Sequence, residues 1–149
     1  MPMNARDRQR LVASWLLLQT APESRPARED LAWVVEKVWD LCDDAPNDAF
    51  EFILAVLEHD ASPRTMAVLS AGPLEALLRR HGPRMISRVE RRARRDVKFT
   101  QLLDHVWKGA LSSKIWDRVQ HVRERQARHA ALQAAEAADA ASDRDQAEA

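Results

Sequence analysis

Apolar residues recur three and four positions apart through most of the chain, as they do along one face of an α-helix. Leu11, Trp15 and Leu18 follow this spacing, and no stretch alternates apolar and polar residues between turn signals. Glycine occurs only three times, and alanine and the straight-chain residues dominate, which favours helix. We therefore predict an all-α fold: a compact single-domain array of about eight short to medium helices.

The segment 46–60 is apolar on nearly every side. Pro46 suits the first position of a helix, and only a narrow polar strip is left for water. A helix of this kind belongs in the middle of a fold, so we predict that 46–60 is the central helix. Its apolar positions are Phe50, Phe52, Ile53, Leu54, Val56 and Leu57.

Two Gly-Pro pairs, Gly72-Pro73 and Gly82-Pro83, interrupt the middle of the chain. Glycine ends helices readily in the left-handed conformation, and proline cannot continue the preceding helix but suits the start of a new one. We expect each pair to form a sharp corner between two helices. The helices expected on this basis are 5–20, 28–43, 46–60, 63–72, 73–82, 83–95, 97–108 and one from Ser112 or Ser113 onward.

In two predicted helices, the spacing of apolar residues predicts which bulky side chains are buried. In 28–43 the expected core face is Leu31, Val35, Val38 and Cys42, widened by Val34, Trp39 and Leu41. In 97–108 it is Phe99, Leu102, Leu103, Val106 and Trp107. Trp33 points away from the first of these faces, so either a neighbouring element covers it, which we favour, or it is exposed to a partner.

The composition changes near residue 127. Residues 127–149 contain eleven alanines and a single large apolar residue, Leu132. Alanine favours helix, but a helix with nothing to bury is marginal in water. We expect a globular helical domain over 1–126, followed by a frayed, alanine-rich acidic tail over 127–149 that is partly helical or disordered.

The net charge is zero, but the charges are segregated. Residues 23–60 carry eleven acids and three bases, whereas residues 79–98 carry nine bases and two acids. Four of those bases, Arg84, Arg88, Arg91 and Arg95, are spaced 4, 3 and 4 apart. They form an arginine stripe about 16 Å long at ~1.5 Å per residue.

Three interpretations of the arginine stripe remain open: a solvated face turned partly toward the protein's own acidic helices, a contact for an acidic protein partner, or a phosphate or nucleic-acid contact. We favour the first, because the domain is neutral and no aromatic residue lies between Arg79 and Lys98. The acidic residues that we consider for partner binding are Asp40, Asp43, Asp44, Asp48 and Glu51.

No motif for catalysis, cofactor binding or metal binding is present in the sequence. Neither the Gly-rich phosphate loops nor the HExxH and CxxC metal patterns occur. His59 and His81 lie near predicted helix ends, where a capping role is favoured over ligation. We therefore expect no catalytic residue, cofactor or metal.

Three features bear on the source and compartment. Cys42 is the only cysteine, which excludes an internal disulfide and fits a reducing compartment. The segment around Leu11–Leu18 imitates a short secretory signal, but its spacing favours a core helix. Arginine outnumbers lysine 19 to 4, which suggests a GC-rich genome. We expect a cytoplasmic bacterial protein with no membrane association.

The stretch "AGPLEALLRRHG", followed by "ISRVERRARRD" and "LLDHVW", resembles an uncharacterised family of small bacterial helical proteins, a domain of unknown function. The resemblance is best over 62–107 and extends over about 10–122. Its specific part is Gly72-Pro73-Leu74-Glu75 with Leu77, Leu78, His81 and Gly82; Pro83 departs from the pattern and is expected to sharpen the corner. The resemblance implies an all-α fold and no known activity.

From these observations we expect a non-enzymatic protein-interaction module, an adaptor or an immunity-type inhibitor. The candidate contact residues are Arg84, Arg88, Arg91, Arg95, Trp33, Asp40, Asp43 and Asp44. The alternative is a nucleic-acid-associated accessory protein that uses the arginine stripe. Self-association through charge-complementary faces is a further expectation.

Overall fold

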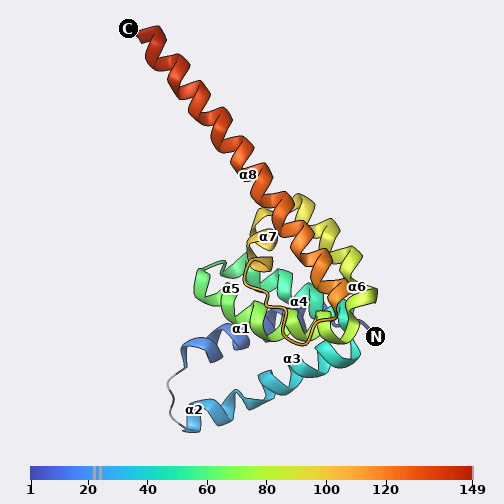
Figure 1. The fold of residues 1–149 in the computed structure, drawn as a ribbon. Helices are drawn as coiled ribbons and strands as arrows, with labels where there is room; N and C mark the ends of the chain where they lie inside the picture. The colour runs from blue at the N-terminus through green and yellow to red at the C-terminus, as the bar shows by residue number, and fades with distance from the viewer. Residues whose placement is uncertain (22, 24, 149) are drawn as a thin grey trace.

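The computed structural model describes residues 1–21, 23 and 25–148 of the 149-residue chain. These residues contain helices and no strand, so the prediction of an all-α fold is confirmed (Figure 1). In chain order the elements are α1 (Ala5–Thr20), α2 (Arg25–Asp30), α3 (Ala32–Asp44), α4 (Pro46–His59), α5 (Pro63–Leu69), the π-helical turn η1 (Ser70–Leu74), α6 (Glu75–Arg95), α7 (Val97–Leu103) and α8 (Ser113–Glu148).

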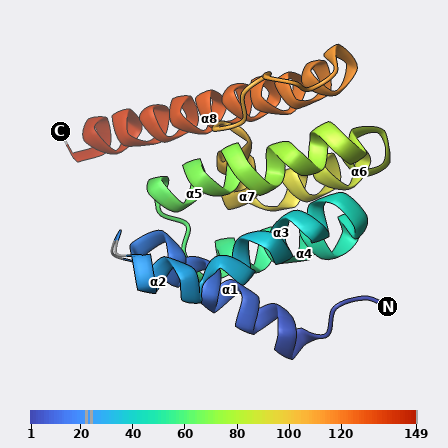
Figure 2. The same ribbon diagram turned by 90° about the horizontal axis from the view of Figure 1, so that it is seen from below.

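Helix α4 lies at the centre of the array, as its apolar pattern predicts. It contacts α1, α3, α6, α7 and η1. Figure 2 shows the helices in successive layers, with α1 and α2 on one side, α3 and α4 next, then α5 to α7, and α8 on the far side. All six apolar positions predicted for this helix are buried.

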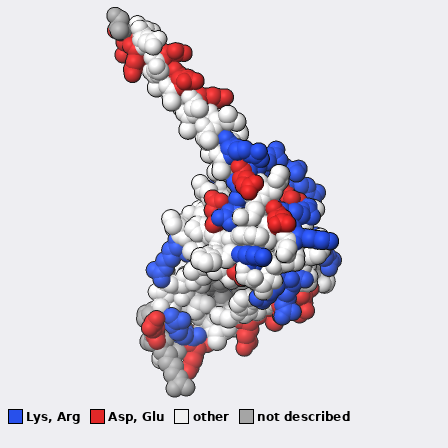
Figure 3. All heavy atoms as spheres, in the orientation of Figure 1, with Lys and Arg blue, Asp and Glu red and all other residues white. Residues whose placement is uncertain are grey.

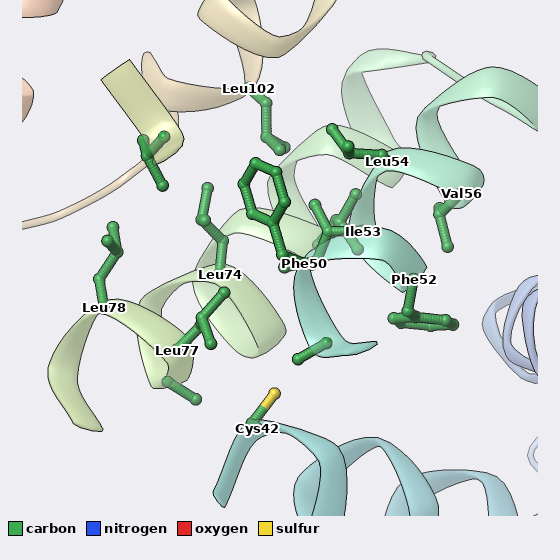
Figure 4. Packing of buried hydrophobic residues seen from close by; sticks show 14 of the residues in the cluster. Cys42, Phe50, Phe52, Ile53, Leu54, Val56, Leu74, Leu77, Leu78 and Leu102 are labelled. Atoms are coloured by element: carbon green, nitrogen blue, oxygen red, sulfur yellow. The ribbon is translucent and has the colours of Figure 1, made fainter. Parts of the chain in front are cut away.

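The aromatic side chains of α4 hold the neighbouring helices from two sides. The ring of Phe52 meets Trp15 of α1 edge-on at 6.1 Å between centroids, and Phe50 meets Phe99 of α7 at 5.6 Å. Edge-to-face pairs at these distances add to the free energy gained from burial. Figure 4 shows Phe50 directed toward Leu74 and Leu102, and Phe52 directed away from them.

The Gly72-Pro73 pair does not form the expected corner. The chain stays helical through it as η1, in which the N–H of Glu75 donates to the carbonyl oxygens of Ser70 and Gly72. Proline lacks an N–H and crowds the carbonyl one turn earlier, and a π-helical turn widens the backbone at that point. The helix therefore passes the proline instead of ending before it.

The corner expected at Gly82-Pro83 is present as a kink. Helix α6 consists of two helical segments that meet at His81, directly before this pair, where a φ of −126° and a ψ of 24° leave the helical region. Among the described residues the only glycine with positive φ is Gly109. Gly82 instead is buried beside Ile115 of α8, so its function is to permit close packing.

Other boundaries follow local signals with two exceptions. Ser62 caps α5 by accepting the N–H of Thr65 at 3.4 Å. The predicted helix 28–43 is divided at Leu31 into α2 and α3, and the predicted helix 97–108 ends at Leu103. The prediction of about eight helices thus misplaces some ends: one predicted helix is divided, and another ends early, whereas the two predicted on either side of Gly82-Pro83 correspond to the two segments of the kinked α6.

Three bulky residues assigned to the core by periodicity are exposed. Val35 and Trp39 are 42 % and 43 % exposed, because α3 buries a different face that consists of Val34, Val38, Leu41 and Cys42. Trp107 is 76 % exposed because α7 ends at Leu103, so the helical spacing no longer determines where residue 107 points.

Helix α8 packs on α6 and α7 only near its start, where Ile115 and Val119 are buried. From residue 127 to residue 148 every side chain is exposed, and the helix projects away from the body (Figure 1). The structure continues this helix to Glu148; the fraying expected for 127–149 stays a prediction.

Candidate functional site

The arginine stripe lies on the solvent side of α6. The opposite side of the same helix is buried and carries Met85, Ile86, Val89 and Ala93, as the sequence predicts. Arg84, Arg91 and Arg95 are exposed, and Arg88 is partly buried. An amphipathic helix anchored on one side therefore holds four guanidinium groups along its other side.

Arg88 is held by contacts with α4. Its guanidinium lies 4.6 Å from the centre of the Phe50 ring, donates to Asn47 Oδ1 at 3.0 Å, and pairs with Glu51. Cation–π contact and an ion pair together fix the orientation of an otherwise flexible side chain. This part of the stripe faces the protein's own acidic helix.

Arg84, Arg91 and Arg95 differ from Arg88 in that they make no ion pair among the described residues. Because their charges are not neutralised locally, they remain available to an external anion. The stripe is thus divided between one arginine that stabilises the contact of α4 with α6 and three that face solvent.

A shallow pocket of about 320 Å³ lies between α4 and α6, and we call it the arginine pocket. Its lining residues are Phe50, Glu51, Leu54, Arg88, Arg91, Arg92 and Arg95. Arg92 pairs with Asp96 at 2.9 Å, so Glu51 and Asp96 balance two of the four arginines. Guanidinium groups bind carboxylates and phosphates in a bidentate manner, and the arginine pocket has the chemistry to hold such a group.

The acidic candidate residues differ in their surroundings. Asp43 pairs with Arg80 of α6 at 2.7 Å. Asp48 accepts the backbone N–H of Met3 at 3.1 Å, whereas Asp40 and Asp44 are exposed. The acidic ends of α3 and α4 therefore lie against α6, where they neutralise part of its charge.

Trp33 is partly covered by a neighbouring helix. The guanidinium of Arg10 in α1 lies 5.0 Å from the centre of its ring, and the side chain is 37 % exposed. Trp33 is thus partly covered by a neighbouring element and partly exposed, so each of the two predicted alternatives holds in part. Trp33 is far from the arginine stripe in the chain.

A second basic concavity lies between α6 and α8, with a volume of about 470 Å³. The basic residues that line this α6–α8 groove are Arg94, Arg125, Arg128, His121 and His129. The sequence does not reveal this groove, because the basic residues of 99–128 and the acidic residues of 129–149 nearly cancel in net charge. Residues 79–128 alone contain fifteen lysines and arginines against five acids, a net charge of +10.

The remaining titratable candidates serve structural functions. Burial raises the pKa of the Cys42 thiol to about 12, with a further contribution from the carboxylate of Asp43. His81 Nε2 lies 2.8 Å from the carbonyl oxygen of Asp43 and so connects the kink of α6 to the end of α3. Within the described part of the chain, no three His, Cys, Asp or Glu side chains are grouped so that they could hold a metal ion.

The comparisons with known proteins address the family and leave the activity open. No helix in the described residues is both long enough and apolar enough to span a bilayer. None of the curated proteins and none of the solved structures matches the chain. Residues 21–127, which include α3 to α7 and the start of α8, match a family of unknown function, DUF6869. The chain belongs to this family.

Proposed function

We propose that this protein is a non-catalytic binding module whose arginine stripe captures an acidic segment of a protein partner. The observation that carries the proposal is the exposure of Arg84, Arg91 and Arg95 on one helix face without local ion pairs. Glu51 and Phe50 hold Arg88 within the same row, so the row is partly preorganised before any partner arrives.

The geometry favours a helical acidic partner. The four arginines follow one side of a helical segment, so their counterparts must also recur about every 5 Å along a line, as acids spaced three and four apart on a helix do. Charge complementarity of this kind mainly speeds and orients association. The expected binding is therefore moderate in affinity and sensitive to salt.

The compartment is part of the same proposal. A single cysteine that is buried fits a reducing cytoplasm. The high arginine and alanine content supports a bacterial source with a GC-rich genome. An adaptor or an immunity-type inhibitor is the class of protein that fits a small binding domain with segregated charge.

The test uses a fluorescein-labelled helical peptide of about 20 residues with glutamates spaced alternately four and three apart, titrated at low salt and followed by anisotropy. The variant R84E/R91E/R95E is expected to bind about tenfold or more weakly, since it replaces three attractions with repulsions. The control R6E/R79E/K114E changes the net charge equally at exposed positions off the stripe. Equal binding by all three proteins would refute the proposal.

A second candidate function is nucleic-acid association, which the α6–α8 groove favours. Arg94, Arg125 and Arg128 extend the basic surface beyond the stripe, and polyanions bind to such extended surfaces by releasing counterions. The same titration with duplex DNA and with RNA tests this alternative. Binding that is weakened by R94E/R125E/R128E would support it, and no binding at tens of micromolar would remove it.

A further inference from the structure

The projecting part of α8 carries three acidic residues in a row, in line with one apolar residue. Glu136, Asp139 and Asp143 recur at intervals of three and four, and Leu132 precedes Glu136 by four residues. All four side chains are exposed, and Leu132 is 64 % exposed. We call Leu132, Glu136, Asp139 and Asp143 the acidic stripe.

The three acids of the acidic stripe are spaced 3 and 4 residues apart, so they cover about 10 Å of the helix at ~1.5 Å per residue. The arginine stripe, spaced 4, 3 and 4, contains the same intervals in both directions. The three acids therefore match three successive arginines whether the helices run parallel or antiparallel, and Leu132 takes the fourth position. Residues 129–149 carry five acids and one base, against an arginine stripe with three unpaired arginines.

The acidic stripe cannot reach the arginine stripe of its own chain without breaking α8. The helix runs from Ser113 to Glu148 without interruption and points away from the body (Figure 1). No glycine or proline follows Gly109 to provide a hinge. Figure 3 shows basic side chains gathered over the body where α8 leaves it and acidic side chains along the projecting helix.

We infer that the acidic stripe of α8 docks as a helix on the arginine stripe of a second copy of this chain. The inference rests on the proposed function, because it supplies a partner for the same surface. In the antiparallel arrangement Asp143 and Glu136 face the free guanidinium groups of Arg84 and Arg91, Asp139 lies opposite Arg88, which also pairs with Glu51, and Leu132 lies opposite Arg95. An external acidic partner then competes with the tail of a second copy.

The expected association is weak and depends on salt. Exposed ion pairs contribute little individually, so self-association is expected at protein concentrations on the order of 100 μM in low salt. Raising the ionic strength to about 0.5 M shortens the Debye length to a few ångströms and is expected to weaken association at least tenfold. The interface joins unlike surfaces, so it produces either reciprocal pairs or longer head-to-tail chains.

Sedimentation velocity of the full chain at low and high salt tests the inference with two complementary variants. E136Q/D139N/D143N removes the acidic stripe, and R84Q/R91Q/R95Q removes the free arginines. Each variant alone is expected to be a monomer, whereas a mixture of the two retains one intact pair of surfaces and forms a heterodimer. D40N/D44N/E58Q, which neutralises three exposed acids of α3 and α4, is the control and is expected to associate like the wild type.

Several outcomes overturn the inference. The wild type could remain monomeric at several hundred micromolar in low salt, the tail variant could associate as the wild type does, or only the control could lose association. The glutamate peptide separates the inference from the proposed function. Peptide binding to a chain that does not self-associate overturns the inference alone, and a chain that neither binds the peptide nor self-associates overturns both.

Discussion

Substitution of Gly82 tests how α8 is held on the body. Gly82 lies within α6 without a positive φ, so its φ does not require glycine. A methyl group added at Cα would lie 2.7 Å from Cγ1 and 3.0 Å from Cδ1 of Ile115. Ile115 is 4 % exposed and β-branched, which leaves it little freedom to move aside.

Two effects of the G82A substitution oppose each other. Replacing glycine by alanine inside a helix stabilises by about 1 kcal/mol, whereas forcing a methyl group into a packed core costs roughly 1–3 kcal/mol. Because the space at Ile115 is occupied, we expect the steric cost to prevail by up to about 2 kcal/mol. At about 2–4 °C per kcal/mol for a domain of this size, Tm falls by several degrees.

The variant I115A reverses the sign of the effect. Removing the isoleucine side chain alone costs roughly 2–5 kcal/mol, but it also removes every atom that the new methyl group would meet. In that background G82A is expected to stabilise by about 1 kcal/mol, through helix propensity and partial filling of the cavity. The interaction energy between the two substitutions should therefore exceed about 1 kcal/mol.

The assay is urea unfolding of the wild type, both single variants and the double variant, followed by circular dichroism at 222 nm. If G82A stabilises the wild type by the full amount expected from helix propensity, and if the two effects add, then Gly82 is not in close contact with Ile115. In that case the explanation given for this glycine is wrong.

Two further predictions concern titratable groups. Because burial raises the pKa of Cys42 to about 12, we expect its thiol to resist a disulfide reagent at pH 8 in the folded chain and to react rapidly in urea, as absorbance would show; fast labelling of the folded chain would contradict this. Hydrogen bonds from Thr65 and Ser62 lower the pKa of Asp60 below its ordinary value of 3.8. The stability that these bonds provide is complete above that value and is lost as the pH falls below it. D60N should therefore flatten the pH dependence of urea unfolding between pH 5 and 3, roughly one unit either side of the ordinary carboxyl pKa. An unchanged slope would exclude this function for Asp60.

Interactions within one or two turns are sufficient to predict much of this fold. The bounds of α4, the cap at Ser62 and the outward direction of Arg84, Arg91 and Arg95 follow from residues that are close in sequence. Such features depend on periodicity and on hydrogen bonds to nearby backbone groups, and both are visible in the chain itself.

The tertiary structure decided the features that depend on distant residues. The sequence predicts the kink next to Gly82 but not the close packing of this glycine against Ile115, which is 33 positions later. Arg88 is held by Phe50 and Glu51 of another helix, and the α6–α8 groove arises only because two distant basic segments pack together. Trp39 is exposed because packing, not periodicity, selects which side of α3 faces the core. Local sequence therefore determined which residues are helical and where charge faces solvent. Contacts between distant parts of the chain decided which helices meet and which cationic surfaces result. The reason is that the free energy of packing depends on pairs of elements and not on either element alone.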